Sequence, residues 1–138
     1  MLQDFSAPPT TASSPDRPRR TRRTAALRDF VRETSLSVSD FIHPLFIVEG
    51  SGVRKPIETM PGHAQLSVDQ LAAEIADARA LGLRAVLLFG IPQRKDALGS
   101  GAWDADGPVP RAIAEIKRLA PEMLVIADVC LCEYTSHG

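Results

Sequence analysis

The chain has 138 residues, with 16 Lys and Arg against 17 Asp and Glu, a formal net charge of −1 and 44% hydrophobic residues. This composition is typical of a globular protein and excludes a collagen-like or wholly disordered chain. The balanced charge gives no global reason to expect nucleic acid or a membrane as partner, and no run approaches the roughly 18 apolar residues of a spanning helix. Because the N-terminus also lacks the apolar core of a secretory signal, we expect a cytoplasmic protein.

Residues 1–35 predict an N-terminal arm. Residues 1–24 are rich in Pro, Ser, Thr, Ala and Arg and lack apolar periodicity, so we expect them to be disordered when isolated. Five arginines crowd this stretch: Arg17, Arg19, Arg20, Arg22 and Arg23. They favour a solvated arm that docks on a partner subunit, over a nucleic-acid patch or a transit peptide.

The first regular elements follow the arm. Apolar residues at 27, 30 and 31 have helical spacing, and a turn is predicted at 37–40. The almost continuous apolar run 41–48 predicts a strand that is buried on both faces. Pro44 lies inside this run and lacks a backbone donor, so we expect the strand pairing to break or bulge nearby.

A helix with clear end signals comes next. Ser67 is expected to cap its first turn, with Gln70 three residues later as the partner in a capping box. Gly82 is expected to end it as a C′ glycine.

The remaining segments continue an alternation of strands and helices. Residues 84–90 predict a buried strand, 91–107 a long polar loop, 109–119 an amphipathic helix and 123–129 a third buried strand. Continuous apolar strands that alternate with helices indicate right-handed βαβ units in a parallel sheet, so the fold class is α/β.

Two architectures fit this class, an open doubly wound sheet and a (β/α)₈ barrel. No glycine-rich dinucleotide fingerprint follows the early strands, which weakens the first. A barrel needs about 250 residues, and the third predicted strand is followed by no covering helix. We therefore expect these residues to be the N-terminal part of a longer protein.

The densest cluster of reactive side chains follows the third predicted strand, at the edge where parallel α/β folds build active sites. Cys130 and Cys132 lie one residue apart, which suits a local chelate for a thiophilic cation better than a structural disulfide. Glu133 and His137 are further potential ligands, since zinc needs at least three protein groups. The alternative is that both cysteines are merely small hydrophobic residues at a strand end.

Several motifs together resemble the porphobilinogen synthase, or δ-aminolevulinic acid dehydratase, family. They occur in family order from about Arg19 to Gly138: FIHPLFIVEG (41–50), MPG (60–62), LFGIP (88–92), KD-x-x-GS (95–100), AIAEIK (112–117) and DVCLCEYTSHG (128–138). The resemblance implies that residues 36–138 form the first βα units of an incomplete (β/α)₈ TIM barrel. It also implies that the arm embraces a neighbouring subunit in a homo-oligomer, usually an octamer.

The implied reaction joins two molecules of 5-aminolevulinate into porphobilinogen with loss of two waters, in the tetrapyrrole pathway that leads to haem. The family uses two barrel lysines, one or both of which form Schiff bases with substrate, downstream of the motif at which this sequence stops. Lys55, Lys95 and Lys117 match neither position, so we expect the 138-residue chain alone to be inactive.

The resemblance also implies a metal. Zinc-using members hold a catalytic Zn²⁺ with three cysteines, of which the first two match Cys130 and Cys132, and the third is expected beyond Gly138. Other members replace these cysteines with acidic residues and use magnesium; whether an additional Mg²⁺ binds here is left open.

The resemblance assigns supporting roles to other residues of the last motif. Asp128 matches an acid near the active site that orients a substrate amine or a lysine, although tying down a loop is an equal alternative. Ser136 and His137 are expected to position the metal loop. His43 stands where the family commonly has tyrosine, and a buried, hydrogen-bonded histidine is expected there.

Two hypotheses compete with an N-terminal fragment of a zinc-type enzyme. One is a truncated, non-catalytic assembly or interaction module that acts through its arm. The other is a standalone metal-binding βαβ domain, which the uncovered third strand disfavours.

Overall fold

The computed structural model describes residues 19–138. Arg17 and the other residues before 19 lie outside the described part. The chain divides into two compact units, with the boundary between Ser35 and Leu36. That the first unit acts as an arm stays a prediction.

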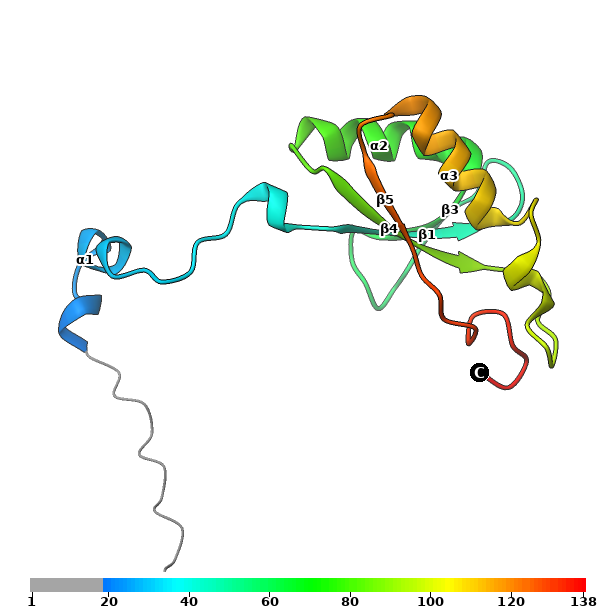
Figure 1. The fold of residues 1–138 in the computed structure, drawn as a ribbon, viewed down its shortest axis with the longest axis horizontal. Coiled ribbons are helices and arrows are strands. Elements are labelled where there is room, and N and C mark those ends of the chain that lie inside the picture. The colour runs from blue at the N-terminus through cyan, green and yellow to red at the C-terminus, as the bar shows by residue number, and fades with distance from the viewer. Residues whose placement is uncertain (1–18) are drawn as a thin grey trace, which may run out of the picture. The chain divides into compact units, whose positions relative to one another are not determined.

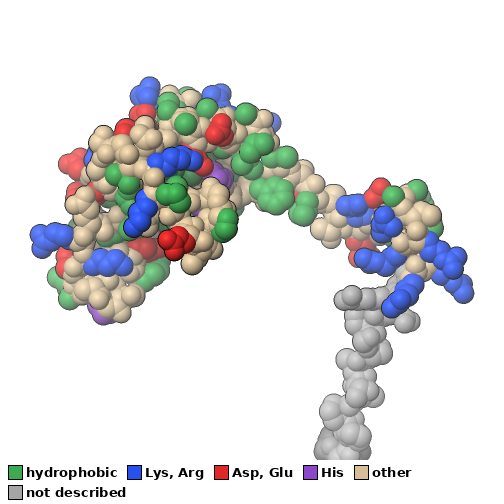
Figure 2. Space-filling model, turned by 180° about the vertical axis from the view of Figure 1, so that it is seen from behind, with side chains coloured by type: hydrophobic (Ala, Val, Ile, Leu, Met, Phe, Trp, Pro, Cys, Tyr) green, Lys and Arg blue, Asp and Glu red, His purple; other side chains and the backbone are tan. Residues whose placement is uncertain are grey.

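The described part of the first unit, residues 19–35, contains a 3-10 turn at Arg19–Arg22 and the short helix α1 (Ala25–Phe30). Thr24 caps α1, because its side-chain oxygen accepts a hydrogen bond from the Leu27 N–H at 3.2 Å. The helix that the spacing of apolar residues predicts in this region is thus confirmed. Arginine side chains gather on this unit (Figure 2), and the Phe30 side chain is 88% exposed.

The second unit is built on one five-stranded sheet with the order β2-β3-β1-β4-β5. The β2–β3 pair is antiparallel, and the other neighbouring pairs are parallel. The strands are β1 (His43–Val48), β2 (Arg54–Pro56), β3 (Ala64–Ser67), β4 (Ala85–Ile91) and β5 (Leu124–Ala127). The predicted α/β class with parallel strands is confirmed.

Two helices, α2 (Leu71–Ala80) and α3 (Pro108–Leu119), cover the same face of this sheet (Figure 1). Shorter 3-10 turns lie at Val38–Asp40, Val68–Gln70 and Ser100–Trp103. The core lies between the sheet and these helices and consists of Leu45, Ile47, Leu66, Leu71, Ile75, Val86, Leu88, Ala112, Ile116, Ala120 and Met123.

The strands are not buried on both faces, as their apolar runs had predicted. In β1 the fully buried residues Leu45 and Ile47 alternate with half-buried neighbours. On the face away from the helices, Phe46 and Phe89 stack on each other with ring centroids 5.3 Å apart. The strand sequences are apolar on both faces, whereas helices cover only one face within the described residues.

The break in pairing expected near Pro44 is found on one side of β1 only. The β1–β4 register runs through it without interruption, from His43 opposite Val86 to Val48 opposite Ile91. On the other side, β3 pairs with β1 only from Phe46 onward, so that edge of β1 is open at Pro44. A proline is tolerated at an open edge, because no ladder hydrogen bond is lost there.

The predicted capping box at Ser67 was wrong, although the helix and its end at Gly82 are confirmed. Ser67 is the last residue of β3, and its hydroxyl donates to an Asp69 carboxylate oxygen at 2.6 Å and accepts from the Val53 N–H at 2.9 Å. It therefore joins the loop before β2 to the start of the helical segment. Gly82 has φ +81°, as a C′ glycine requires.

The third predicted strand is shorter than expected and lies at the edge of the sheet. β5 pairs only with β4 among the described strands, and Leu124 on it is 58% exposed.

Among residues 19–138, no helix has both the length and the apolar character that a membrane-spanning helix needs.

Candidate metal centre

The candidate site lies in residues 128–138, here called the thiol segment, which leave the sheet at the carboxyl end of β5. The Asp128 N–H still donates to the Leu88 carbonyl of β4 at 3.1 Å. Beyond it the chain turns away from the sheet, and Cys130 and Cys132 are both exposed free thiols. The cysteines therefore stand at the edge where the sequence predicts a site.

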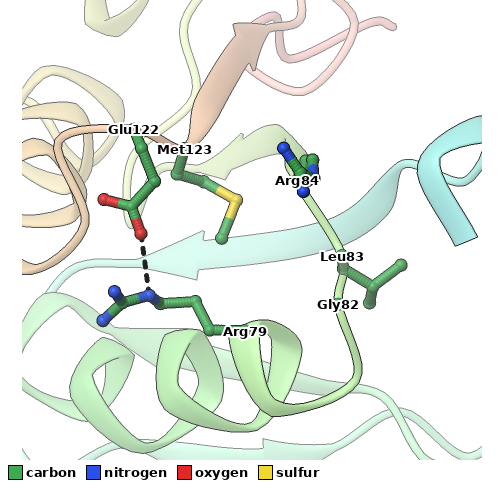
Figure 3. A pocket seen from close by; sticks show the side chains of 6 residues that line it. All are labelled: Arg79, Gly82, Leu83, Arg84, Glu122 and Met123. Atoms are coloured by element: carbon green, nitrogen blue, oxygen red, sulfur yellow. Dashed lines mark ion pairs between the residues drawn. The ribbon is translucent and has the colours of Figure 1, made fainter.

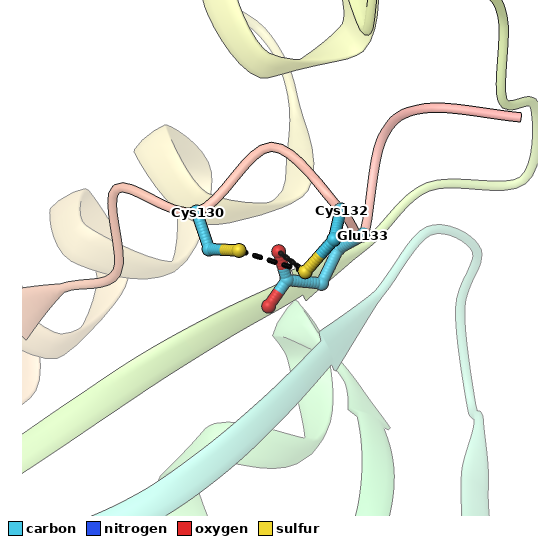
Figure 4. Close-up of side chains that lie close together, drawn as sticks. All are labelled: Cys130, Cys132 and Glu133. Carbon is cyan, nitrogen blue, oxygen red and sulfur yellow. Dashed lines mark hydrogen bonds between the residues drawn. The ribbon is translucent and has the colours of Figure 1, made fainter. Parts of the chain in front are cut away.

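Three donor atoms converge in the thiol segment (Figure 4). The sulfurs of Cys130 and Cys132 lie 2.7 Å apart, and the Cys132 thiol lies 3.7 Å from a Glu133 carboxylate oxygen. One ligand atom from each residue lies within 4.8 Å of the other two, in the only such group in the described part of the chain. Glu133 thus joins the two predicted ligands.

This donor set fits a thiophilic cation such as zinc. Thiolate ligands favour zinc over hard cations, and a carboxylate is an ordinary third ligand. A tetrahedral zinc with sulfurs at about 2.3 Å holds two of them about 3.8 Å apart, so the present sulfurs must separate by about 1 Å. Because both cysteine side chains are exposed, they have room to rotate and separate by this distance. Cys130, Cys132 and Glu133 would hold the cation.

The neighbouring groups keep the Cys132 thiol protonated when no cation is bound. A hydrogen bond with Cys130, partial loss of hydration and the negative charge of Glu133 raise the pKa of Cys132 to about 11. A cation must therefore displace a proton from this thiol when it binds.

The other predicted residues of the thiol segment stay outside this donor group. Asp128 is exposed, and its carboxylate accepts from the N–H of Val129 at 2.9 Å, which is a local bond of the loop-tying kind. Ser136 donates its N–H to the Asp96 carbonyl at 2.9 Å, whereas His137 is exposed. The catalytic role of Asp128 stays a prediction.

Contacts with the β4–α3 loop were missed at the sequence level. Asp96 donates its N–H to the Tyr134 carbonyl at 3.3 Å and forms a parallel bridge with Thr135. The Lys95 amine donates to the Cys132 carbonyl at 3.4 Å. The available signal was the KD-x-x-GS motif, which lies in the predicted long polar loop and served only for the family resemblance.

His43 lies away from the metal centre, on the helix side of β1. Its Nε2 lies 3.2 Å from a Glu74 carboxylate oxygen on α2, and Arg54 donates to the other oxygen at 3.1 Å. The His43 side chain is 21% exposed. The expected hydrogen-bonding partner is thus present, but His43 is only partly buried and not buried as expected; the ring of His63 lies 5.8 Å away.

Among the cavities formed by the described residues, one lies at each end of the sheet with a volume of about 290 Å³. One lies at the amino ends of β4 and β5, where Arg79 and Glu122 form an ion pair at 2.8 Å (Figure 3). The other lies between the end of β1 and the β4–α3 loop, next to Asp96 and Ser100. Neither is lined by the thiols.

Comparisons with known proteins now bear on this geometry. The family model described as "Delta-aminolevulinic acid dehydratase" matches residues 15–138. The chain belongs to the delta-aminolevulinic acid dehydratase family.

Individual members agree with this assignment. A delta-aminolevulinic acid dehydratase of Halalkalibacterium halodurans is 50% identical over 122 residues, which are 88% of this chain and 37% of the relative. One of Bacillus subtilis is 48% identical over 123 residues, 89% of this chain and 38% of the relative. The chain therefore spans just over a third of the length of these dehydratases.

A solved structure of the family also matches. The delta-aminolevulinic acid dehydratase of Toxoplasma gondii, crystallised with the reaction product porphobilinogen, aligns with a TM-score of 0.78 and 36% identity. The alignment covers 90% of this chain and 36% of that one. The predicted barrel-type α/β fold is thereby confirmed for the part present.

Of the three lysines of this dehydratase-family chain, only Lys95 lies next to the metal centre, where its amine donates to the Cys132 carbonyl. Lys117 lies on α3 and donates to the Met123 carbonyl at 2.6 Å. Lys55 lies on the exposed strand β2, and Lys95 is exposed in its loop.

Proposed function

We propose that residues 36–138 form the first βα units of a porphobilinogen synthase, which condenses two molecules of 5-aminolevulinate into porphobilinogen with release of two waters. The observation that carries this proposal is the convergence of Cys130, Cys132 and Glu133 at the carboxyl edge of a parallel sheet, in a chain of the dehydratase family. This is the edge at which barrel enzymes bind substrate.

The cation in this proposal is zinc. Cys130 and Cys132 supply two soft ligands, and a third cysteine is expected in polypeptide that follows Gly138. When bound, zinc would supply Lewis-acid polarisation of a substrate carbonyl or amine. Asp128, exposed beside the thiols, would orient an amine of the substrate.

The assembly in this proposal is a homo-oligomer, as the family resemblance implies, and residues 1–35 act as the arm that contacts a neighbouring subunit. The exposed Phe30 and the arginines of the first unit offer both apolar and charged contacts for such docking. The proposed compartment is the cytoplasm, where exposed thiols stay reduced.

The test is a chimaera in which this chain replaces the matched segment of the Bacillus subtilis dehydratase. We expect the chimaera to form porphobilinogen from 5-aminolevulinate, and a Cys130→Ala/Cys132→Ala version to lose the activity. Arg118→Ala is the matched control, since Arg118 forms an exposed ion pair with Glu115 on α3, outside the thiol segment.

A folded chimaera without turnover, beside an active parent, would contradict the proposed function. If that inactive chimaera still formed the oligomer of its parent, the result would support the assembly-module hypothesis instead. Circular dichroism and size-exclusion chromatography separate these cases from simple misfolding.

A further inference from the structure

The thiol segment is fixed at its far end by the loop between β4 and α3. After the bond from Asp128 to Leu88, its next backbone–backbone bonds to the rest of the unit are those of Tyr134 and Ser136 with Asp96. The N–H groups of Tyr134 and Thr135 both donate to the Leu131 carbonyl at 2.9 Å. A turn thus links the anchored residues directly to the cysteines.

The Asp96 side chain organises the loop that provides this anchor. One carboxylate oxygen accepts from the N–H groups of Leu98 at 2.9 Å and Ser100 at 3.0 Å, and the other accepts from the Ser100 hydroxyl. The carboxylate therefore holds the loop in a tight turn. In this turn the N–H and the carbonyl of Asp96 point toward the thiol segment, where they bond Tyr134 and Ser136.

A glycine-lined socket receives the anchored side chains. Thr135 is only 9% exposed. A β-carbon at Gly99, where φ is +67°, would lie 3.1 Å from its methyl carbon, and one at Gly101 would lie 3.4 Å from a Tyr134 ring carbon. The backbone of the loop at Gly99 and Gly101 therefore packs directly against the side chains of Thr135 and Tyr134. Because this contact is close, a change in the shape of the loop is expected to move the thiol segment.

We propose that Asp96 is a positioning residue for the cation ligands: by shaping the β4–α3 loop, it sets where Cys130, Cys132 and Glu133 stand. Both thiols are exposed on a segment outside the sheet, so the bonds of that segment to the loop decide where they stand. Lys95 adds a direct bond to the Cys132 carbonyl. This inference rests on the proposed metal function, and it adds a residue that is not itself a ligand.

The test uses the full 138-residue chain and Cd²⁺ as the probe, followed by thiolate-to-cadmium charge-transfer absorption. We expect Asp96→Ala to weaken the apparent Cd²⁺ affinity about tenfold, the lower end of the effect of residues that orient metal ligands. Asp96→Asn keeps one carbonyl oxygen as acceptor and is expected to restore most of the affinity. Asp104→Ala is the control, because its carboxylate accepts only a local bond from Asp106 in the same loop.

Amide hydrogen exchange supplies a readout without metal. We expect Asp96→Ala to increase exchange at residues 134–136, and Asp104→Ala to leave it unchanged. Equal Cd²⁺ affinity and equal exchange in the two alanine variants would overturn the inference. Absence of charge-transfer absorption in the unsubstituted chain, even with Cd²⁺ in large excess, would overturn the proposed metal function instead. The exchange result would still support or overturn the positioning role. If Asp96→Ala does not fold, Ser100→Ala removes one of the same bonds and takes its place.

Discussion

The phenol of Tyr134 lies over Gly90 at the carboxyl end of β4, so closely that a β-carbon on Gly90 would overlap its hydroxyl oxygen. The added carbon would also lie 2.7 Å from a Val109 methyl carbon on α3. Glycine at this position lets the thiol segment, the sheet and a helix meet at one point. The contact thus links the sheet to the segment that carries both cysteines.

Gly90→Ala is expected to destabilise the chain by about 1–3 kcal/mol, the usual cost of overpacking. Urea unfolding followed by circular dichroism measures this loss. A Tyr134→Ala substitution in the same background should recover part of it, because only the Val109 overlap remains. Strictly additive effects of the two substitutions would show that the contact is not formed.

Gly82 ends α2 in the left-handed region, with φ +81°. Gly82→Ala is expected to cost roughly 1 kcal/mol, because a β-carbon is disfavoured in this conformation. The matched variant Gly82→Asn should cost less, since asparagine tolerates left-handed backbone. Equal unfolding midpoints for alanine, asparagine and glycine would contradict this account of the helix end.

Acid should weaken the junction of β2, β3 and α2 through Asp69. Hydrogen bonds from the Ser67 hydroxyl, the Gln70 amide and the Gly52 N–H hold the pKa of Asp69 well below its usual value. A depressed folded-state pKa adds stability above the unfolded pKa of about 3.9, and this stability is lost as the pH falls below that value. Urea midpoints measured from pH 6 to pH 3 should therefore fall less steeply for Asp69→Asn than for the unsubstituted chain.

Cation binding should strengthen as the pH rises. The Cys132 thiol, with its pKa raised to about 11, is protonated at neutral pH, and a cation must displace that proton. Each displaced proton contributes about tenfold in apparent affinity per pH unit. Cd²⁺ titrations at pH 6, 7 and 8 should show this rise in affinity with pH. The Cys132→Ser variant should show a smaller rise, because it lacks the thiol proton that the cation displaces. A pH-independent affinity would exclude thiolate ligation.

The 138-residue chain alone should produce no porphobilinogen from 5-aminolevulinate and should retain little zinc after dialysis. Its two thiolates and one carboxylate leave the proposed centre without the expected third cysteine. Lys117, on α3, cannot replace the missing barrel lysines, because its amine donates a hydrogen bond to the Met123 carbonyl. Colorimetric detection of product and elemental analysis check both outcomes, and robust turnover by this chain would refute the proposed division of roles.

The local pattern of the sequence was enough to place most elements and both thiols. Helical spacing located α1, α2 and α3, and apolar runs located β1, β4 and β5. One error arose where a side chain found a distant partner: Ser67 was expected to cap its own helix but bonds Val53 fourteen residues earlier. Pro44 was expected to interrupt the pairing of β1, but the β1–β4 register stays intact and only the β3 side is open there.

The sequence by itself determined the strand and helix alternation, the family and the pair of cysteines, because each is encoded in neighbouring residues. Only the tertiary structure decided that Asp96 meets residues 134–136 and that Tyr134 covers Gly90. These contacts join segments about forty residues apart. They arise because β4 and β5 are adjacent in the sheet and their carboxyl ends lie side by side, a relationship that no local pattern contains.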